Sequence, residues 1–470
     1  MEKMTFGIII TNRRFFPDHL VSEERKRILQ KLENMGFNTV ILSEKDTYLG
    51  AVETVEDAKK CADLFKKHQD TIDGIIVVLP NFGDEVGVTQ AIDLSGLKVP
   101  VLVQACDDEL TKMDIKNRRD AFCGKLSLCN NLYQHNIKFT NTTLHSCSID
   151  SEEFTSDIKY FARVCRVVKG LSHARIGAIG QRPNPFHTVR FSEKLLQAYG
   201  ITVTVVDLSE IIFAAQNMNR TEEVENKIKE IKAYGKIHPD IKEENIEKSA
   251  KLSIAIEKWV EEHECDATAI QCWDSIQKNY GCATCLPMSM MGEKGKPSAC
   301  ETDVMGALSM YALYLASGEP SALLDWNNNY GNDRDKCIAI HCSNYPKSFI
   351  ATDFEISNLD ILGNTLGYER CFGALKAKLP AGPFTFARIS TDDTEGIIKA
   401  YVGEGEFTDD PVETMGGVAV CRVSGCQKLM DYLCTEGFEH HVAMNRSLSA
   451  KVLEEALGKY LGWKVYRHEG

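Results

Sequence analysis

The sequence predicts an α/β protein with two Rossmann-like, doubly wound domains followed by a β-rich C-terminal domain. In the first 110 residues, and again after residue 175, short apolar runs alternate with amphipathic helix patterns, as in parallel sheets covered by helices. After about residue 350, Gly, Pro and short alternating runs dominate, which is typical of antiparallel strands. A chain of 470 residues has room for about three domains. The expected domains are residues 1–168, 169–350 and 351–470.

The first domain is expected to alternate strands and helices. Apolar residues recur at helical spacing between the apolar runs, and Gly36 ends the first helix pattern. The predicted strands are Thr5–Ile10, Thr39–Leu42, Gly74–Leu79 and Val99–Gln104. The predicted helices are Ser22–Met35, Val55–His68 and Glu85–Leu94, with a long connecting helix over Asp150–Gly170.

The second and third domains follow from the same patterns. The second block begins with a strand at Arg175. Its other predicted strands are Ile201–Val206, Ala267–Cys272, Leu323–Asp325 and Cys337–Cys342, and its predicted helices are Thr188–Tyr199, Glu222–Gly235, Glu244–Glu264 and Val304–Leu315. In the third domain, the predicted strands are Gly382–Ile389, Gly396–Tyr401 and Gly417–Val423, and the predicted closing helices are Gln427–Thr435 and Leu448–Leu461.

Composition excludes several classes of protein. The net charge of −13 argues against a nucleic-acid binder, which needs a basic face. No apolar run approaches the roughly 18 residues that span a bilayer, and the N-terminus does not resemble a signal peptide. The 17 cysteines are scattered and odd in number, which favours a reduced, cytoplasmic chain. One Cys-x-x-Cys, Cys282–Cys285, is either half a zinc or redox site or a chance pair, and no second pair follows at zinc-finger spacing.

Known nucleotide and nucleophile motifs are missing. The sequence contains no GxGxxG after the first strand, no Walker A motif and no GxSxG elbow. A dinucleotide-dependent enzyme is therefore disfavoured, despite the Rossmann-like layers.

Polar side chains cluster where the predicted strands of the second block end, the edge at which α/β sheets bind ligands. They are Gln271, Trp273, Asp325, Trp326 and His341, and Glu301 opens a helix between them. Each has a plain structural interpretation. Glu301 would complement a helix dipole, Asp325 would stand in a turn, and His341 would be a hydrogen-bonded core residue. The two tryptophans would stack on a sugar or belong to the core.

The adjacent pair His440-His441 follows the helix-ending Gly437. Two neighbouring imidazoles at a loop entry often serve a metal or a proton transfer. Together with Glu301 and Asp325, they offer the oxygen and nitrogen donors that suit a divalent metal such as Mn²⁺. Few ligands come from the protein, so the pattern indicates a catalytic rather than a structural metal site.

At these residues the chain resembles the L-fucose isomerase / L-arabinose isomerase family, in particular its shorter fucose isomerase-like branch. Two segments carry the resemblance: Cys272-Trp273 through Cys300-Glu301-Thr-Asp-Val-Met-Gly-Ala-Leu, and Gly437-Phe-Glu-His440-His441-Val-Ala. The segments around Asp325 and His341 match by position and order. The resemblance covers most of the chain in layout and is most specific over residues 270–345 and 437–446.

The resemblance implies site residues. Glu301 and Asp325 would be both Mn²⁺ ligands and the proton-transfer pair, and His440, preferred over His441, would be the third ligand. His341 would lie beside the metal. Arg13 and Gln271 would contact substrate hydroxyls, with Arg13 serving a neighbouring subunit. The family also implies a homo-oligomer, either a hexamer or a trimer-based assembly, and a small sugar as partner, with no nucleic acid and no membrane.

The implied reaction is an aldose–ketose isomerisation through an enediol. A metal held by adjacent carbonyl and hydroxyl oxygens stabilises the developing charge, and two carboxylates can move the proton between C1 and C2.

The substrate would be a fucose- or arabinose-like aldose or an anionic, for example sulfonated, one. Arg13, Arg14, Arg182 and His187 follow predicted strands and would either be solvated or read an anionic tail. The competing interpretation is a non-enzymatic sugar-binding or regulatory protein on a double-Rossmann scaffold. It explains the two α/β blocks but not the metal-type residues.

Overall fold

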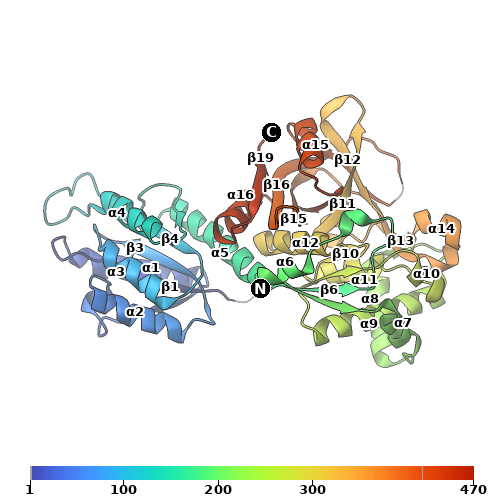
Figure 1. Ribbon diagram of the computed structural model, residues 1–470, viewed down its shortest axis with the longest axis horizontal. Coiled ribbons are helices and arrows are strands. Elements are labelled where there is room, and N and C mark those ends of the chain that lie inside the picture. Colours follow the sequence, from blue (N-terminus) through green and yellow to red (C-terminus); the bar gives the residue numbers. More distant parts are fainter. Residues whose placement is uncertain (1–2, 415) are drawn as a thin grey trace. The chain divides into compact units, whose positions relative to one another are not determined.

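The computed structural model describes residues 3–414 and 416–470 (Figure 1). The chain divides into two compact units, Met1–Lys169 and Gly170–Gly470. Each unit mixes helices with β-sheet, so the α/β class predicted from the sequence is confirmed. The finer division into three domains at residues 168 and 350 stays a prediction.

The first unit contains a five-stranded sheet in which every pair is parallel. In sheet order its strands are β2 (Asn38–Ile41), β1 (Thr5–Ile10), β3 (Ile72–Leu79), β4 (Val101–Ala105) and β5 (Thr140–Asn141). Its helices are α1 (His19–Asn34), α2 (Val55–Lys67), α3 (Glu85–Ser95), α4 (Ala121–Gln134) and α5 (Glu152–Ser172), with a 3₁₀ turn η1 (Tyr48–Gly50). The strand and helix predictions for this region are confirmed within a few residues at each end.

Local chemistry explains why these helices begin and end where they do. Thr54 and Asp57 form a capping box at the start of α2, and Lys66 and Lys67 stand in its last turn. Asp84 caps α3, which ends at Gly96 in the left-handed conformation that glycine adopts readily.

The second unit opens with a smaller parallel sheet. In sheet order its strands are β10 (Ser298–Cys300), β9 (Ala267–Ile270), β6 (Arg175–Ile179) and β7 (Thr202–Val206). The associated helices are α6 (Glu193–Ala198), α7 (Leu208–Gln216), α8 (Glu222–Tyr234), α9 (Glu243–Glu262), α10 (Ser275–Asn279), α11 (Cys285–Glu293) and α12 (Val304–Ser317). The helix predicted over Thr188–Tyr199 is shorter than expected. Its first residues form the 3₁₀ turn η2 (His187–Val189), and Ser192 N–H donates to Thr391 Oγ1 (3.0 Å), which holds the chain extended there.

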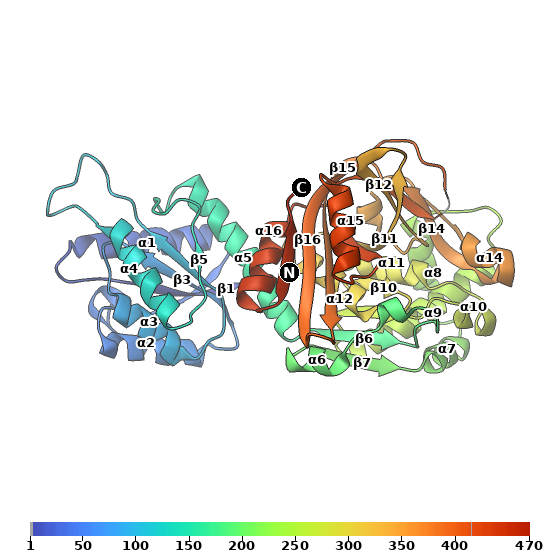
Figure 2. The ribbon, with the colours of Figure 1, turned by 45° about the horizontal axis from the view of Figure 1, so that its top comes forward.

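A ten-stranded mixed sheet forms the rest of the second unit (Figure 2). In sheet order its strands are β19 (Lys464–His468), β16 (Ile397–Thr408), β15 (Gly382–Asp392), β18 (His441–Asn445), β11 (Ser321–Tyr330), β12 (Asp333–His341), β17 (Gly417–Arg422), β14 (Phe372–Lys378), β13 (Glu355–Asn358) and β8 (Lys236–Ile237). The antiparallel character predicted after residue 350 is confirmed by the β15–β16 pairing, seen as two long neighbouring arrows in Figure 2.

Two strand assignments need correction. The predicted strands at Leu323–Asp325 and Cys337–Cys342 do not join the small parallel sheet. They belong to β11 and β12, an antiparallel hairpin in the large sheet that turns at Gly331 with φ +56°. A short apolar run is compatible with a strand in either sheet, so the sequence pattern alone could not show which sheet these strands join.

The remaining helices are α13 (Lys347–Ile350), α14 (Asp360–Leu366), η3 (Tyr368–Arg370), α15 (Cys426–Thr435), α16 (Ala450–Glu454) and the π-helical turn η4 (Glu455–Tyr460). α15 buries Leu429 and Leu433 in the apolar core of the large sheet. All 17 cysteines are free and most are buried, as expected for small apolar residues. Across the described residues, no helix has the length and apolarity to cross a membrane.

Candidate active site

A cavity of about 480 Å³ lies in the second unit, between strands of the large sheet and segments that follow strands of the small sheet. Side chains from β18, β11, β12, β14 and β13 line it, and so do residues that follow the small parallel sheet. Its lining residues are Phe186, Trp273, Glu301, Asp325, Asn327, Ile340, His341, Cys342, Asn358, Leu359, Asp360, Ile361, Asn364, Ala374, Lys376, Thr414, Gly416, His440 and His441.

Glu301 enters this cavity from an unusual backbone. It follows β10, and both Glu301 (φ +62°) and Thr302 (φ +56°) adopt the left-handed conformation, which is costly for residues other than glycine. The cap of α12 is Asp303, whose side chain accepts from Gly306 N–H. Glu301 therefore does not cap α12, and its carboxylate is instead buried at the cavity.

Asp325 and the histidine pair come from neighbouring strands. Asp325 on β11 stands directly opposite His441 on β18 in the antiparallel register. Because side chains alternate across a strand, Trp326 points to the other face, where its indole Nε1 donates to Tyr401 Oη (3.1 Å). Residues more than a hundred positions apart are thereby brought side by side in the sheet.

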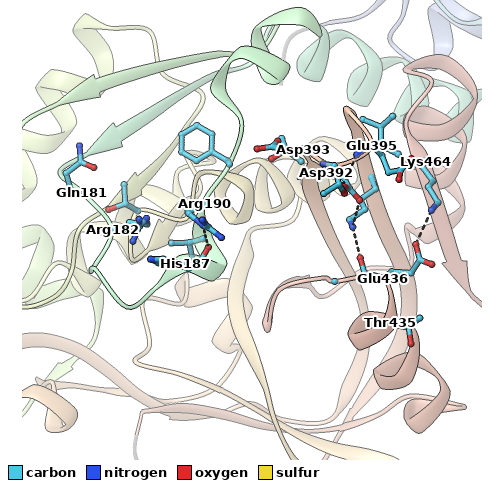
Figure 3. A pocket seen from close by; sticks show the side chains of 18 residues that line it. Gln181, Arg182, His187, Arg190, Asp392, Asp393, Glu395, Thr435, Glu436 and Lys464 are labelled. Carbon is cyan, nitrogen blue, oxygen red and sulfur yellow. Dashed lines mark hydrogen bonds and ion pairs between the residues drawn. The ribbon is translucent and has the colours of Figure 1, made fainter.

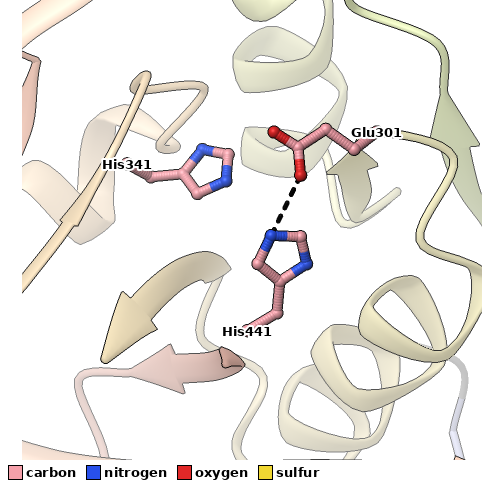
Figure 4. Close-up of side chains that lie close together, drawn as sticks. All are labelled: Glu301, His341 and His441. Atoms are coloured by element: carbon pink, nitrogen blue, oxygen red, sulfur yellow. Dashed lines mark ion pairs between the residues drawn. The ribbon is translucent and has the colours of Figure 1, made fainter. Parts of the chain in front are cut away.

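His441 is the centre of the cluster (Figure 4). Its Nε2 lies 3.0 Å from Glu301 Oε2 and 3.4 Å from Asp325 Oδ1. Figure 4 shows the His441 and Glu301 side chains pointing toward each other with the His341 ring beside them. The ring centroids of His341 and His441 are 5.5 Å apart. His440 is half-exposed and its Nε2 is 3.7 Å from Asp325 Oδ1.

On the Nδ1 side of its ring, His441 is held by a buried network of charged residues. Asp303 Oδ2 lies 2.8 Å from His441 Nδ1, and Arg388 donates to both Asp303 oxygens at 2.6 and 3.0 Å. Arg388 Nε also donates to Glu439, which accepts from Ser390 Oγ. Both Arg388 and Asp303 are fully buried. A carboxylate on Nδ1 fixes the ring so that Nε2 faces Glu301 and Asp325.

The cluster strongly favours positive charge. Burial lowers the pKa of His441, but contacts with Asp303 and Glu301 outweigh this and raise the pKa to about 10. Burial raises the pKa of Glu301, while the contact with His441 and the nearby imidazoles bring it below its usual value. Burial and the charge of His441 lower the pKa of His440. The carboxylates of the cluster therefore stabilise a proton or a metal cation between them and the imidazole of His441.

The residues present fit a divalent metal. His341 Nδ1 is buried and has no hydrogen-bond partner among the described residues, and the buried oxygens Glu301 Oε2 and Asp325 Oδ1 both face the single Nε2 of His441. Ligand atoms of Glu301, His341 and His441 lie within 4.8 Å of one another, and so do those of Asp325, His440 and His441. Unpaired buried polar atoms are costly, and these carboxylate and imidazole donors suit metals such as Mn²⁺.

The structure brings together some predicted site residues and not others. Trp273 and His341 line the cavity with the carboxylates. Gln271 does not: its Oε1 accepts from Gln181 N–H (3.0 Å), and it lines a separate hollow. Trp326 is partly buried and packs against the apolar core of the large sheet, outside the cavity, because the strand alternation turns it away. Arg13 lies in the first unit, in an ion pair with Glu85 and over the Phe82 ring.

His187 lines a second and larger hollow of about 1220 Å³ (Figure 3). Charged groups there are largely matched: Lys399 pairs with Asp392 (2.8 Å) and Lys464 with Glu436 (3.0 Å). Arg182 and Arg190 donate to backbone carbonyls of their own loop. This hollow brings no metal-type cluster together within the described part of the chain.

The residues behind and beside the cluster were not predicted from the sequence. Asp303 stands two residues after Glu301, so its cap position was a signal. Arg388 lies in the middle of a strand and gave none. Lys376 and Asn358, on β14 and β13, were also missed because nothing in their local pattern marks a cavity.

The chain is similar to sugar isomerases. Residues 7–172 match the family model "Fucose/sulfoquinovose isomerase, N-terminal domain", and residues 339–469 match "L-fucose isomerase, C-terminal domain". A sulfoquinovose isomerase from Priestia aryabhattai is 24% identical over 451 residues, covering 94% of this chain and 95% of that protein. One from Alkalicoccus urumqiensis is 27% identical over 299 residues, covering 62% and 65%.

Among solved structures, a solute-binding protein from Burkholderia multivorans is 12% identical and covers 68% of this chain and 95% of its own, with a TM-score of 0.17. That superposition is too weak to indicate a shared fold.

Proposed function

Because the chain belongs to the fucose isomerase-like family, we propose that it is an aldose–ketose isomerase acting on a sulfonated aldose, such as the sulfoquinovose named in its relatives. One observation carries the proposal. Two carboxylates and an imidazole from distant segments converge in a cavity of about 480 Å³, which is large enough for a hexose.

The proposed metal ligands are Glu301, Asp325 and His441, with Mn²⁺ as the expected ion. His441 replaces His440 because His441 Nε2 contacts both carboxylates, while His440 contacts only Asp325. When bound there, the metal would supply positive charge that stabilises the negative charge developing on two adjacent substrate oxygens.

Glu301 and Asp325 are proposed to move the proton. One carboxylate takes the proton from C2 of the open-chain aldose, which leaves an enediolate, and the pair returns the proton to C1. The hydroxyl proton of O2 is transferred to O1, so the aldose and the ketose have the same atoms. The burial of Glu301 keeps this exchange away from bulk water, and the unpartnered His341 Nδ1 is available to a substrate hydroxyl.

The family also supports finer expectations. We propose a homo-oligomer, hexameric or trimer-based, in the cytoplasm, with Arg13 serving a neighbouring subunit. The parallel sheets of the two units support the Rossmann-like arrangement expected for the first two domains. Sedimentation of the purified chain tests the assembly, and a monomer would contradict it.

The test of the function is direct. The purified chain is supplied with Mn²⁺ and incubated with sulfoquinovose, and the ketose is detected by NMR. Ketose formation that stops with EDTA and returns with Mn²⁺ supports the isomerase. Sugar binding that survives EDTA, without conversion, would instead indicate a non-enzymatic sugar-binding protein.

A further inference from the structure

We propose that the cavity carries a second, anion-binding subsite in which Lys376, Asn358 and Asn364 hold the sulfonate at the far end of the substrate. The inference rests on the proposed isomerisation of a sulfonated sugar, and it adds the residues that would distinguish a sulfonated aldose from a neutral one.

Lys376 is the one Lys or Arg among the residues described as lining this cavity. Its side chain is 33% exposed, and its Nζ lies 2.7 Å from Asp360 Oδ2, its one ion-pair partner in the described chain. An ammonium group has three N–H donors, so two remain for an anion in the cavity. Asp360 holds the ammonium at the cavity wall.

Two side-chain amides lie in the lining of the same cavity. Asn364 Oδ1 accepts from Tyr368 Oη (2.7 Å), which leaves its NH₂ group as the free end of the amide. Half-buried Asn358 adds a second side-chain amide to the lining of the cavity. A sulfonate offers three oxygens and no proton, so it matches a lysine flanked by amide donors.

The sheet order sets the distance between the two ends. Asp325 lies on β11 and Lys376 on β14, three strands away through β12 and β17. At about 4.8 Å per strand, with an offset along the strands, their backbones are roughly 15 Å apart. A lysine side chain reaches about 6 Å, and a six-carbon chain ending in sulfur spans about 8 Å. An open-chain hexose with C1 and C2 at the carboxylates would therefore bring a C6 sulfonate to Lys376.

Other cations of the second unit are poorly placed for this role. Arg182 and Arg190 line the larger hollow and donate to backbone carbonyls of their own loop. Lys399 and Lys464 are paired with acidic residues in that hollow. The cavity that holds Glu301 and Asp325 thus offers Lys376 as its cation.

The test compares charge selectivity in wild type, Lys376→Met, Lys376→Arg and the control Lys378→Met, which changes an exposed lysine on the same strand outside the cavity. Kinetics with Mn²⁺ and calorimetric binding are measured for sulfoquinovose and for quinovose, its neutral counterpart without the sulfonate. We expect Lys376→Met to raise KM and Kd for sulfoquinovose about ten- to hundredfold and leave those for quinovose within about twofold. Lys376→Arg and Lys378→Met should retain most of the selectivity.

Equal losses for both sugars in Lys376→Met, or no loss for either, would overturn the inference. If wild type binds sulfoquinovose but does not convert it, the proposed function fails while the ratio of Kd values still tests Lys376. If wild type neither binds nor converts it, both proposals fall. Should Lys376→Met not fold, Lys376→Gln takes its place in the same comparison.

Discussion

His441 and Asp303 form a buried imidazole–carboxylate pair, with Nδ1 2.8 Å from Oδ2, and this pair aims His441 Nε2 at Glu301 and Asp325. Asp303 does not line the cavity. It acts through His441, so its effect should be on the position and affinity of the bound metal rather than on the sugar.

The first prediction concerns Asp303→Asn. The substitution keeps the shape of the side chain and removes the carboxylate that holds His441. Metal affinity, measured by calorimetry with Mn²⁺, should fall about 10- to 100-fold. Asp392→Asn, which changes an acid of the other hollow, serves as the control and should leave affinity unchanged. Unaltered Mn²⁺ affinity in Asp303→Asn would mean that His441 is held by other contacts.

The second prediction concerns Arg388. Replacing it with Met leaves the buried carboxylates of Asp303 and Glu439 without their cation. Loss of one partner of a buried ion pair costs about 3–5 kcal/mol, so the free energy of unfolding in urea should fall by that amount. Arg388→Lys restores the charge without the paired N–H donors and should lose less. A Met variant as stable as wild type would contradict the predicted role of the ion pair.

The third prediction separates the two adjacent histidines. His441→Asn should abolish stoichiometric Mn²⁺ binding and isomerisation together, because His441 contacts both carboxylates. His440→Asn should retain the metal and lose at most about tenfold in kcat, since its ring is half-exposed and contacts only Asp325. Metal content by atomic emission distinguishes them. The opposite pattern would restore His440 as the ligand.

The fourth prediction concerns Trp326. Trp326→Phe removes the hydrogen bond to Tyr401 and some packing in the apolar core, so stability should fall by about 1–3 kcal/mol. The KM for the sugar should stay the same, since Trp326 is outside the cavity. Trp273→Phe is the comparison, because Trp273 lines the cavity and its change should raise KM. A raised KM in Trp326→Phe with unchanged stability would return Trp326 to the site.

Much of the layered fold could be predicted because it depends on local patterns. The run Thr5–Ile10 and the helix that Gly36 terminates are determined by apolar periodicity and by a glycine stop. The pairing of β11 and β12 could not be read in this way. Whether Leu323–Asp325 joins a parallel or an antiparallel sheet depends on contacts with residues 441–445, which no local pattern records.

The site was predictable where side chains stand at element ends. Glu301 directly follows β10, as predicted, whereas Asp325 was found although its strand, β11, continues to Tyr330 beyond the predicted end. The sequence offered no basis for choosing between His440 and His441, whereas the strand register sets His441 opposite Asp325. Arg388 and Lys376 lie within strands, and only the tertiary structure gives them a partner or a cavity.

A crystal grown with Mn²⁺ shows whether one divalent metal binds between Glu301, Asp325 and His441. Anomalous scattering at the manganese edge should give a single peak about 2 Å from Glu301 Oε2, Asp325 Oδ1 and His441 Nε2, and the peak should vanish in Glu301→Gln. Manganese bound elsewhere, or no peak between these three side chains in the wild type, would contradict the account.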